Sequence, residues 1–190
     1  LSALAILWSS AKLAAQDNVN KKIINNNGNI SLITFKKNAE KSNTSRTSIF
    51  QELLNISEGT EMKLEQSVDN HNLRDEKFKQ YYKNIPVENG VYNLHYNAEQ
   101  LTSMNGEFFS TESIISTNPK ISNEDALSIA IKSVGAEKYM WEDKDYIANN
   151  SYKKPTGTLV FLPVQNDKNS YTLTLAYKFD IYAAKPISRS

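Results

Sequence analysis

The two histidines, His71 and His95, are the side chains best suited to metal chemistry in this sequence. Zinc hydrolases commonly hold their metal through two histidines one helical turn apart, in an HExxH motif that also supplies a general base. No such motif occurs in the 190 residues. A site built on both histidines would need help from Asp69 or Asp75, but isolated imidazoles are usually structural, because zinc requires several ligands in fixed geometry. We therefore expect no metal ligand among them.

Other catalytic motifs are also missing from the sequence. A serine nucleophile needs a positioned base and an orienting acid, and no Gly-x-Ser-x-Gly turn is present. Cysteine is absent, so thiol chemistry and disulfides are excluded, and no glycine-rich phosphate loop occurs. The acidic pair Glu142 and Asp143 falls in a polar stretch, where an exposed, solvated face is the simplest interpretation. We predict that the chain is not catalytic by itself and needs no cofactor.

The charge balance gives no support to two further classes of partner. The 22 basic residues are matched by 21 acidic ones, which argues against nucleic acid and against an anionic membrane surface. A length of 190 residues allows one domain or two small ones, each with its own core.

Residues 1–15 differ from all that follow. The sequence there is LSALAILWSSAKLAA, an apolar run followed by small residues, and it resembles the end of a secretory signal peptide. The alternative is an amphipathic N-terminal helix; a transmembrane span is disfavoured because the run is short and Lys12 interrupts it. We expect residues 1–16 to be a signal-peptide remnant, the protein to be exported, and the sequence to begin inside a larger precursor.

The centre of the chain is the aromatic-rich stretch 78–96, which reads FKQYYKNIPVENGVYNLHY. Apolar and aromatic residues recur at helical intervals here, at Leu73, Phe78, Tyr81 and Tyr82. We therefore predict a helix through these residues that reaches Lys83 or Asn84 and is terminated by Pro86. An Asn-Gly turn at residues 88–90 would then lead into a strand over residues 91–96.

This stretch, together with MNGEFF at residues 104–109, resembles the fungalysin/thermolysin propeptide domain of secreted zinc metallopeptidases. The positions that match the family's pattern are Gln80, Tyr82, Pro86, Val87, His95, Asn105 and Gly106. One departure is Asn84, which replaces the family's glycine before the Ile-Pro step. Asparagine tolerates positive φ better than other non-glycine residues, so the turn is expected to survive.

Residues 17–110 are expected to form the first module. It would contain a turn at 25–28, a strand over 30–35, and a helix that begins at Thr47 or Ser48 and ends near Gly59. The apolar stripe of that helix is Ile49, Phe50, Leu53 and Leu54. A strand at 62–64 follows, and residues 101–109 would pair with strand 91–96 around an Asn105-Gly106 turn.

Residues 111–190 are expected to form the second module, after a polar connection at 110–119. Ser122 would cap a helix that Gly135 ends, with an apolar stripe of Ala126, Ile129, Ala130 and Val134. Strands are predicted over 158–164 and, by strict alternation, over 171–181. This order of one helix and two strands, with Leu175-Ala176-Tyr177 on the last strand, resembles the PepSY-type module. In thermolysin-like precursors that module follows the fungalysin/thermolysin propeptide domain, and here we expect it to be incomplete at its C-terminal end.

The resemblance implies an α+β protein of two small modules, each a helix packed on an antiparallel sheet in a cystatin-like way. It also implies a function: the pro-region of a secreted thermolysin-like zinc metalloendopeptidase, acting as intramolecular chaperone and inhibitor. The partner would be the chain's own downstream catalytic domain, which would carry zinc, with calcium as a further candidate. The alternative is a freestanding secreted inhibitor or peptide-binding protein built from the same modules.

Tyrosines are the candidate contact residues, because their large apolar rings carry a polar tip. Tyr81, Tyr82, Tyr92 and Tyr96 could equally form the core of the first module, and both roles stay open for different rings. The surface predicted to contact the peptidase comprises Tyr81, Tyr82, Pro86, Val87, Tyr92, His95 and Tyr182.

Overall fold

The computed structural model describes residues 18–37, 45–114, 116–150, 152–166 and 170–189. The predicted signal-peptide remnant, residues 1–16, lies outside the described residues. Contacts divide the chain into two units, Leu1–Ile114 with Pro163–Leu173, and Ile115–Leu162 with Thr174–Ser190. Each unit is described by itself, and the predicted module borders stay predictions.

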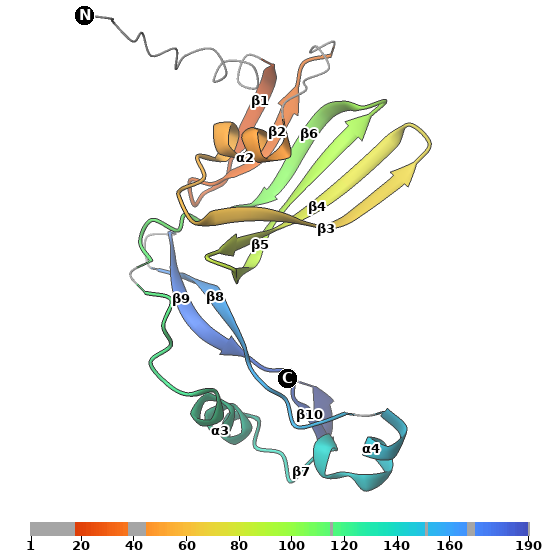
Figure 1. Cartoon of the computed structure of the whole chain (residues 1–190), viewed down its shortest axis with the longest axis vertical. Helices are drawn as coiled ribbons and strands as arrows, with labels where there is room; N and C mark the ends of the chain where they lie inside the picture. Colours follow the sequence, from red (N-terminus) through yellow and green to blue (C-terminus); the bar gives the residue numbers. More distant parts are fainter. Residues whose placement is uncertain (1–17, 38–44, 115, 151, 167–169, 190) are drawn as a thin grey trace, which may run out of the picture. The chain divides into compact units, whose positions relative to one another are not determined.

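The first unit is built on an antiparallel sheet with the strand order β1-β2-β6-β5-β4-β3 (Figure 1). Its strands are β1 (Val19–Ile24), β2 (Ile30–Phe35), β3 (Thr60–Asn70), β4 (Leu73–Tyr82), β5 (Ile85–Asn97) and β6 (Gln100–Glu107). The predicted strand over residues 30–35 is therefore correct, and the predicted turn at 25–28 joins it to β1, where Gly28 N–H donates to the Asn25 carbonyl. The pairing of residues 91–96 with 101–107 is also confirmed.

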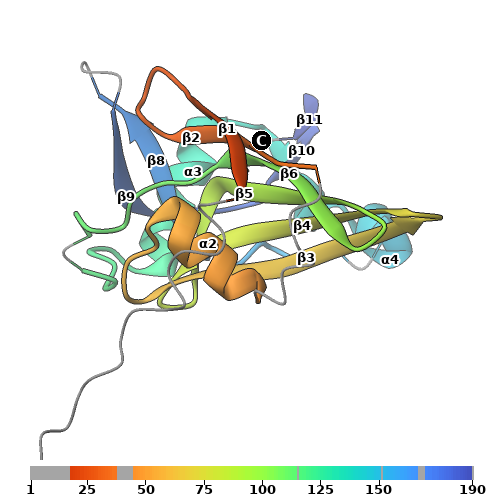
Figure 2. The ribbon, with the colours of Figure 1, turned by 90° about the horizontal axis from the view of Figure 1, so that it is seen from above.

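Helix α2 (Arg46–Leu54) covers one face of this sheet, as Figures 1 and 2 show. All four predicted apolar residues of the helix are buried. The Phe50 ring meets Phe78 edge-on at 5.0 Å and Tyr92 at 6.3 Å, which places the core between helix and sheet. The N-cap is Ser45, two or three residues before the predicted caps, and its side chain accepts from Ser48 N–H. The helix ends at Asn55, in the left-handed conformation, rather than at Gly59.

The predicted helix from Leu73 to Lys83 or Asn84 is wrong: Leu73–Tyr82 forms strand β4. Burial alternates along it, with Glu76, Phe78 and Gln80 buried and Lys77 exposed. The period is two, but two of the three inward-facing side chains are polar, so an apolar pattern alone does not reveal it.

The predicted turn at residues 88–90 is not the place where the chain reverses, since these residues lie within β5; the register with β4 shifts there, between Pro86 and Val91, and Asn89 has a positive φ. The chain reverses earlier, at Lys83 and Asn84, which both have positive φ. Asn84 thus takes the backbone conformation expected of it. Pro86 pairs with Tyr81 inside the sheet rather than ending a helix, and Gly106 pairs with Tyr92 inside β6 rather than forming a turn.

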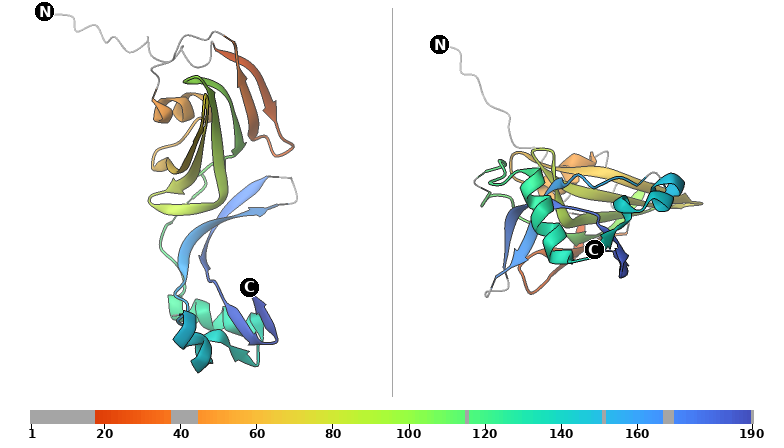
Figure 3. Two further views of the ribbon diagram at one scale, coloured as in Figure 1. Left: turned by 90° about the vertical axis from the view of Figure 1, so that its right-hand side faces the viewer. Right: turned by 90° about the horizontal axis from the view of Figure 1, so that it is seen from below.

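The second unit contains helix α3 (Asn123–Val134), capped by Ser122 and ended by Gly135 as predicted. Its buried face differs from the prediction: Leu127 is in the core, whereas Ile129 is 61% exposed. Tyr139 and Ile181 complete that core. Further elements are β7 (Lys138–Tyr139), η1 (Met140–Glu142), α4 (Lys144–Asn150), β10 (Tyr182–Lys185) and β11 (Ile187–Arg189), with sheet order β11-β10-β7 (Figure 3).

Strands β8 (Thr158–Gln165) and β9 (Tyr171–Lys178) pair with each other. The strand predicted over 171–181 is therefore shorter than expected and ends at Lys178. The prediction of an α+β fold, with antiparallel sheets and few helices, is confirmed.

Candidate functional site: the central strands of the first unit

The predicted contact residues occupy very different environments. Val87 and Tyr92 are fully buried, at 0% exposure, so neither can touch a partner of the folded first unit. Tyr92 also donates a short hydrogen bond from its hydroxyl to the Ile30 carbonyl, and burial raises its pKa. Tyr92, like the buried Tyr96, is therefore a core tyrosine.

The other predicted contact residues are half-buried, and their contact role stays a prediction. Tyr81, Tyr82 and Pro86 cluster around the β4–β5 turn, and His95 lies further along β5. Tyr182 belongs to the second unit, where its ring meets Tyr152 edge-on at 5.0 Å.

His95 links three neighbouring strands on the sheet face opposite α2. Its Nδ1 lies 2.6 Å from Asp75 Oδ1 on β4, and its Nε2 lies 2.6 Å from Asn105 Oδ1 on β6. Both ring nitrogens are thus engaged with side-chain oxygens. Within the described parts of the chain, no group of three or more His, Asp or Glu side chains is arranged to hold a metal ion.

The same open face carries charges of both signs. Glu65 on β3 forms ion pairs with Lys77 at 3.3 Å and Lys79 at 3.9 Å on β4. Lys63 lies over the Tyr81 ring at 4.6 Å and donates to the Asn84 side chain at 2.8 Å. Such a surface suits recognition of a polar partner, because it offers both signs of charge beside an aromatic ring.

Gln80, which matches the family's pattern, is fully buried, and its side chain binds the backbone of Phe109. Its amide nitrogen donates to the Phe109 carbonyl at 2.7 Å, and the Phe109 N–H donates back to its Oε1 at 3.0 Å. The side chain thereby satisfies two backbone groups that would otherwise be buried without partners. It fixes the direction in which the chain leaves β6.

Gly106 also matches the family's pattern, and the backbone of β5 lies so close to it that a side chain would not fit. A Cβ there would lie 2.0 Å from the Val91 carbonyl oxygen and 2.7 Å from Tyr92 Cα. The requirement for glycine comes from the backbone of β5 and not from a turn.

A buried carboxylate, Glu76, joins α2 to the sheet. Both of its oxygens accept short hydrogen bonds from the Arg46 guanidinium, and Arg74 Nε lies 3.2 Å away in an ion pair. The hydrogen bonds from Arg46 hold the pKa of Glu76 below its ordinary value, against the opposing effect of burial. Glu99, 68% exposed, binds the outer side of Arg74 at 2.9 Å.

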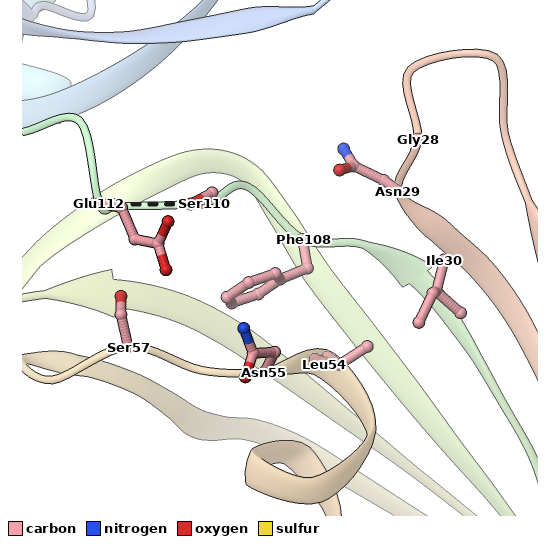
Figure 4. Close-up of a pocket in the computed structure, with 9 residues that line it drawn as sticks. All are labelled: Gly28, Asn29, Ile30, Leu54, Asn55, Ser57, Phe108, Ser110 and Glu112. Carbon is pink, nitrogen blue, oxygen red and sulfur yellow. Dashed lines mark hydrogen bonds between the residues drawn. The ribbon is translucent and has the colours of Figure 1, made fainter.

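A pocket of about 200 Å³ opens at the C-terminal end of α2 (Figure 4). Ile30, Leu54 and Phe108 supply its apolar surface. Its polar lining residues are Gly28, Asn29, Asn55, Ser57, Ser110 and Glu112. The hydroxyl of the lining residue Ser57 lies 2.7 Å from that of the buried Thr111, which is also 2.6 Å from the Thr60 hydroxyl. The sequence interpretation missed this pocket, because its walls come from three separate segments.

Glu76 was missed for a different reason. A period-two interpretation of residues 74–82 would have placed it on the inward face, where a carboxylate requires a cationic partner. The available signal was therefore the alternation of β4 rather than any motif.

These observations define an α+β protein whose first unit is an antiparallel sheet, with one helix on one face and, among the described residues, no helix on the other. In a comparison with protein families, residues 73–108 of this chain match the family described as Fungalysin/Thermolysin Propeptide Motif. The matched segment contains β4, β5, β6 and Phe108.

Two other comparisons complete the findings. The solved Bacillus megaterium YpeB C-terminal domain is similar over 85% of this chain and 70% of that chain, with 13% identity and a TM-score of 0.33. No curated protein matches the chain. Of the helices in the described residues, none is both long enough and apolar enough to cross a bilayer.

Proposed function

We propose that this chain is the pro-region of a secreted thermolysin-like zinc metalloendopeptidase, which helps the downstream catalytic domain to fold and inhibits it until the pro-region is removed. The observation that carries the proposal is the propeptide motif at residues 73–108. The catalytic domain would supply the zinc and the bond-breaking groups.

One interface accounts for both roles. A surface that binds the native catalytic domain but not its unfolded chain stabilises the native form, by about 2.7 kcal/mol when the effective concentration is 100 times the Kd. If the bound surface also covers the active-site cleft, it inhibits. The open face of β4, β5 and β6 is the candidate surface, because α2 covers the other face.

The test uses the purified full chain in trans. We expect micromolar chain to inhibit a mature thermolysin-like peptidase and to raise its refolding yield from denaturant, while a serine peptidase is unaffected. Equal effects on both peptidases would indicate a non-specific substrate or crowding effect. An absence of inhibition together with an absence of refolding assistance would overturn the proposal.

A freestanding peptide-binding protein is the second candidate, and strand β3 favours it. Among the described strands β3 pairs only with β4, so its other edge is open to an added strand. The coding sequence after Ser190 separates the candidates: an HExxH motif with a downstream glutamate ligand favours the pro-region, and a stop codon favours the binding protein.

A further inference from the structure

The pocket at the end of α2 is lined by negative charge and by no positive charge. None of its nine lining residues is basic, and Glu112 contributes a carboxylate to its rim. No side chain in the described residues pairs with that carboxylate through an ion pair or hydrogen bond. In Figure 4 it extends from its loop toward the Phe108 ring and Ser57.

The helix end adds a second source of negative potential. Leu54 and Asn55, the last residue and C-cap of α2, line the pocket, and the last turn of the helix contains no basic residue. The final carbonyl groups of a helix lack intrahelical partners and carry about half a negative charge. A cation in the pocket would therefore be favoured by both the helix end and Glu112.

A second carboxylate lies close by. Glu107 accepts from Asn29, which lines the pocket, at 2.7 Å, and from Asn25 at 3.1 Å. Neutral amides bind this carboxylate, so its negative charge is not cancelled. The charge adds to that of Glu112.

The size and surface of the pocket restrict the ligand further. A volume of about 200 Å³ is below the roughly 300–1,000 Å³ of small-molecule sites, so it accommodates one side chain rather than a whole ligand. Ile30, Leu54 and Phe108 suit an aliphatic stem. Lysine and arginine combine such a stem with a charged end.

We propose that this pocket binds a single lysine or arginine side chain presented by a polypeptide partner. The stem packs on Phe108 and Leu54, and the cationic group lies between Glu112 and the C-terminal carbonyls of α2. This site is separate from the open sheet face and does not depend on the proposed pro-region function.

The experiment titrates the ¹⁵N-labelled full chain with Nα-acetyl-arginine methylamide or its lysine counterpart, and follows amide signals by NMR. We expect saturable shifts at Ser57, Phe108 and Glu112, with a Kd on the order of 1–10 mM for so small a probe. The norleucine analogue keeps the stem without the charge and should bind about tenfold more weakly.

Three variants sharpen the test. Glu112→Gln should weaken arginine binding by about fivefold to tenfold. The matched control Glu137→Gln removes an exposed charge in the second unit and should leave the Kd unchanged. Ser110→Leu places an apolar side chain at the rim and should abolish the shifts.

Four results would overturn the assignment. They are an absence of saturable shifts at about 20 mM probe, equal binding of the norleucine analogue, equal weakening by both glutamate variants, and unchanged binding by Ser110→Leu. Each variant's amide spectrum establishes that it is folded before its titration is interpreted.

Discussion

Replacing Glu76 with glutamine should destabilise the first unit by about 2 kcal/mol at neutral pH. The Arg46 guanidinium makes two hydrogen bonds to the carboxylate, and each charge-assisted bond contributes about 1.5–3 kcal/mol in mutational studies. Arg46 is 49% exposed, so solvent screening reduces that sum, and glutamine retains one acceptor. The pair is still far from a surface ion pair, because Glu76 itself is only 2% exposed.

Glu99→Gln is the matched control, because Glu99 pairs with Arg74, a residue that also faces Glu76. At 68% exposure its loss should cost no more than about 0.5 kcal/mol. Urea unfolding followed through the NMR amide signals of β4 and β5 isolates the first unit. With an m-value of about 2 kcal/mol per molar, Glu76→Gln should lower the midpoint by about 1 M and Glu99→Gln by about a quarter of that.

The pH dependence provides an independent check. The folded-state pKa of Glu76 lies below its unfolded value, so the stabilisation is complete above about pH 4.3 and is lost as the pH falls through the folded pKa. The difference between the wild type and Glu76→Gln should therefore narrow in acid. Equal losses for the two variants at pH 7, or a gap that stays constant in acid, would refute the reasoning.

Three further substitutions test the scaffold with the same unfolding assay. Gln80→Leu should cost about 2–4 kcal/mol and speed hydrogen exchange at the Phe109 amide, since it leaves two buried backbone groups unpaired; unchanged exchange would contradict this. Gly106→Ala should lower the free energy of unfolding by about 3 kcal/mol or more, because the new Cβ clashes with Val91. Gly28→Ala is the control, with no atom within 4 Å of the new Cβ, and should lower it by only about 1 kcal/mol. Equal losses for the two variants would contradict the close approach of β5 to Gly106. Asn84→Val should cost about 1–2 kcal/mol because of its positive φ, while Asn84→Gly should be neutral; a valine variant as stable as the wild type would disprove the turn's strain.

The elements that could be predicted from the sequence are those whose signals are local. Ser122 and Gly135 mark the ends of α3 through capping chemistry, which depends only on neighbouring residues. The strand over residues 30–35 was predicted from its β-branched and aromatic content alone.

The failures arise where tertiary contacts decide. Strand β4 was predicted as a helix because its inward face contains Glu76 and Gln80, whose partners, Arg46 and Phe109, are about 30 residues away in the sequence. No local pattern shows that a glutamate is buried. The pocket at the end of α2 is formed by segments up to 84 residues apart, Gly28 to Glu112, so its existence also depends on the fold.

The positions of the pattern residues bear on how this surface recognises a partner. Gln80 and Val87 are fully buried, and Gly106 lies against the backbone of β5. These residues therefore specify how β4, β5 and β6 pack, and they cannot determine which protein is bound. If the open face binds the proposed partner, side chains such as Lys77, Lys79 and the half-buried Tyr81, which are not among the pattern positions, are available to set specificity. The pattern positions are thus of two kinds: Gln80, Val87 and Gly106 are set by packing, whereas His95 and Asn105 lie on the open face, where a partner could also contact them.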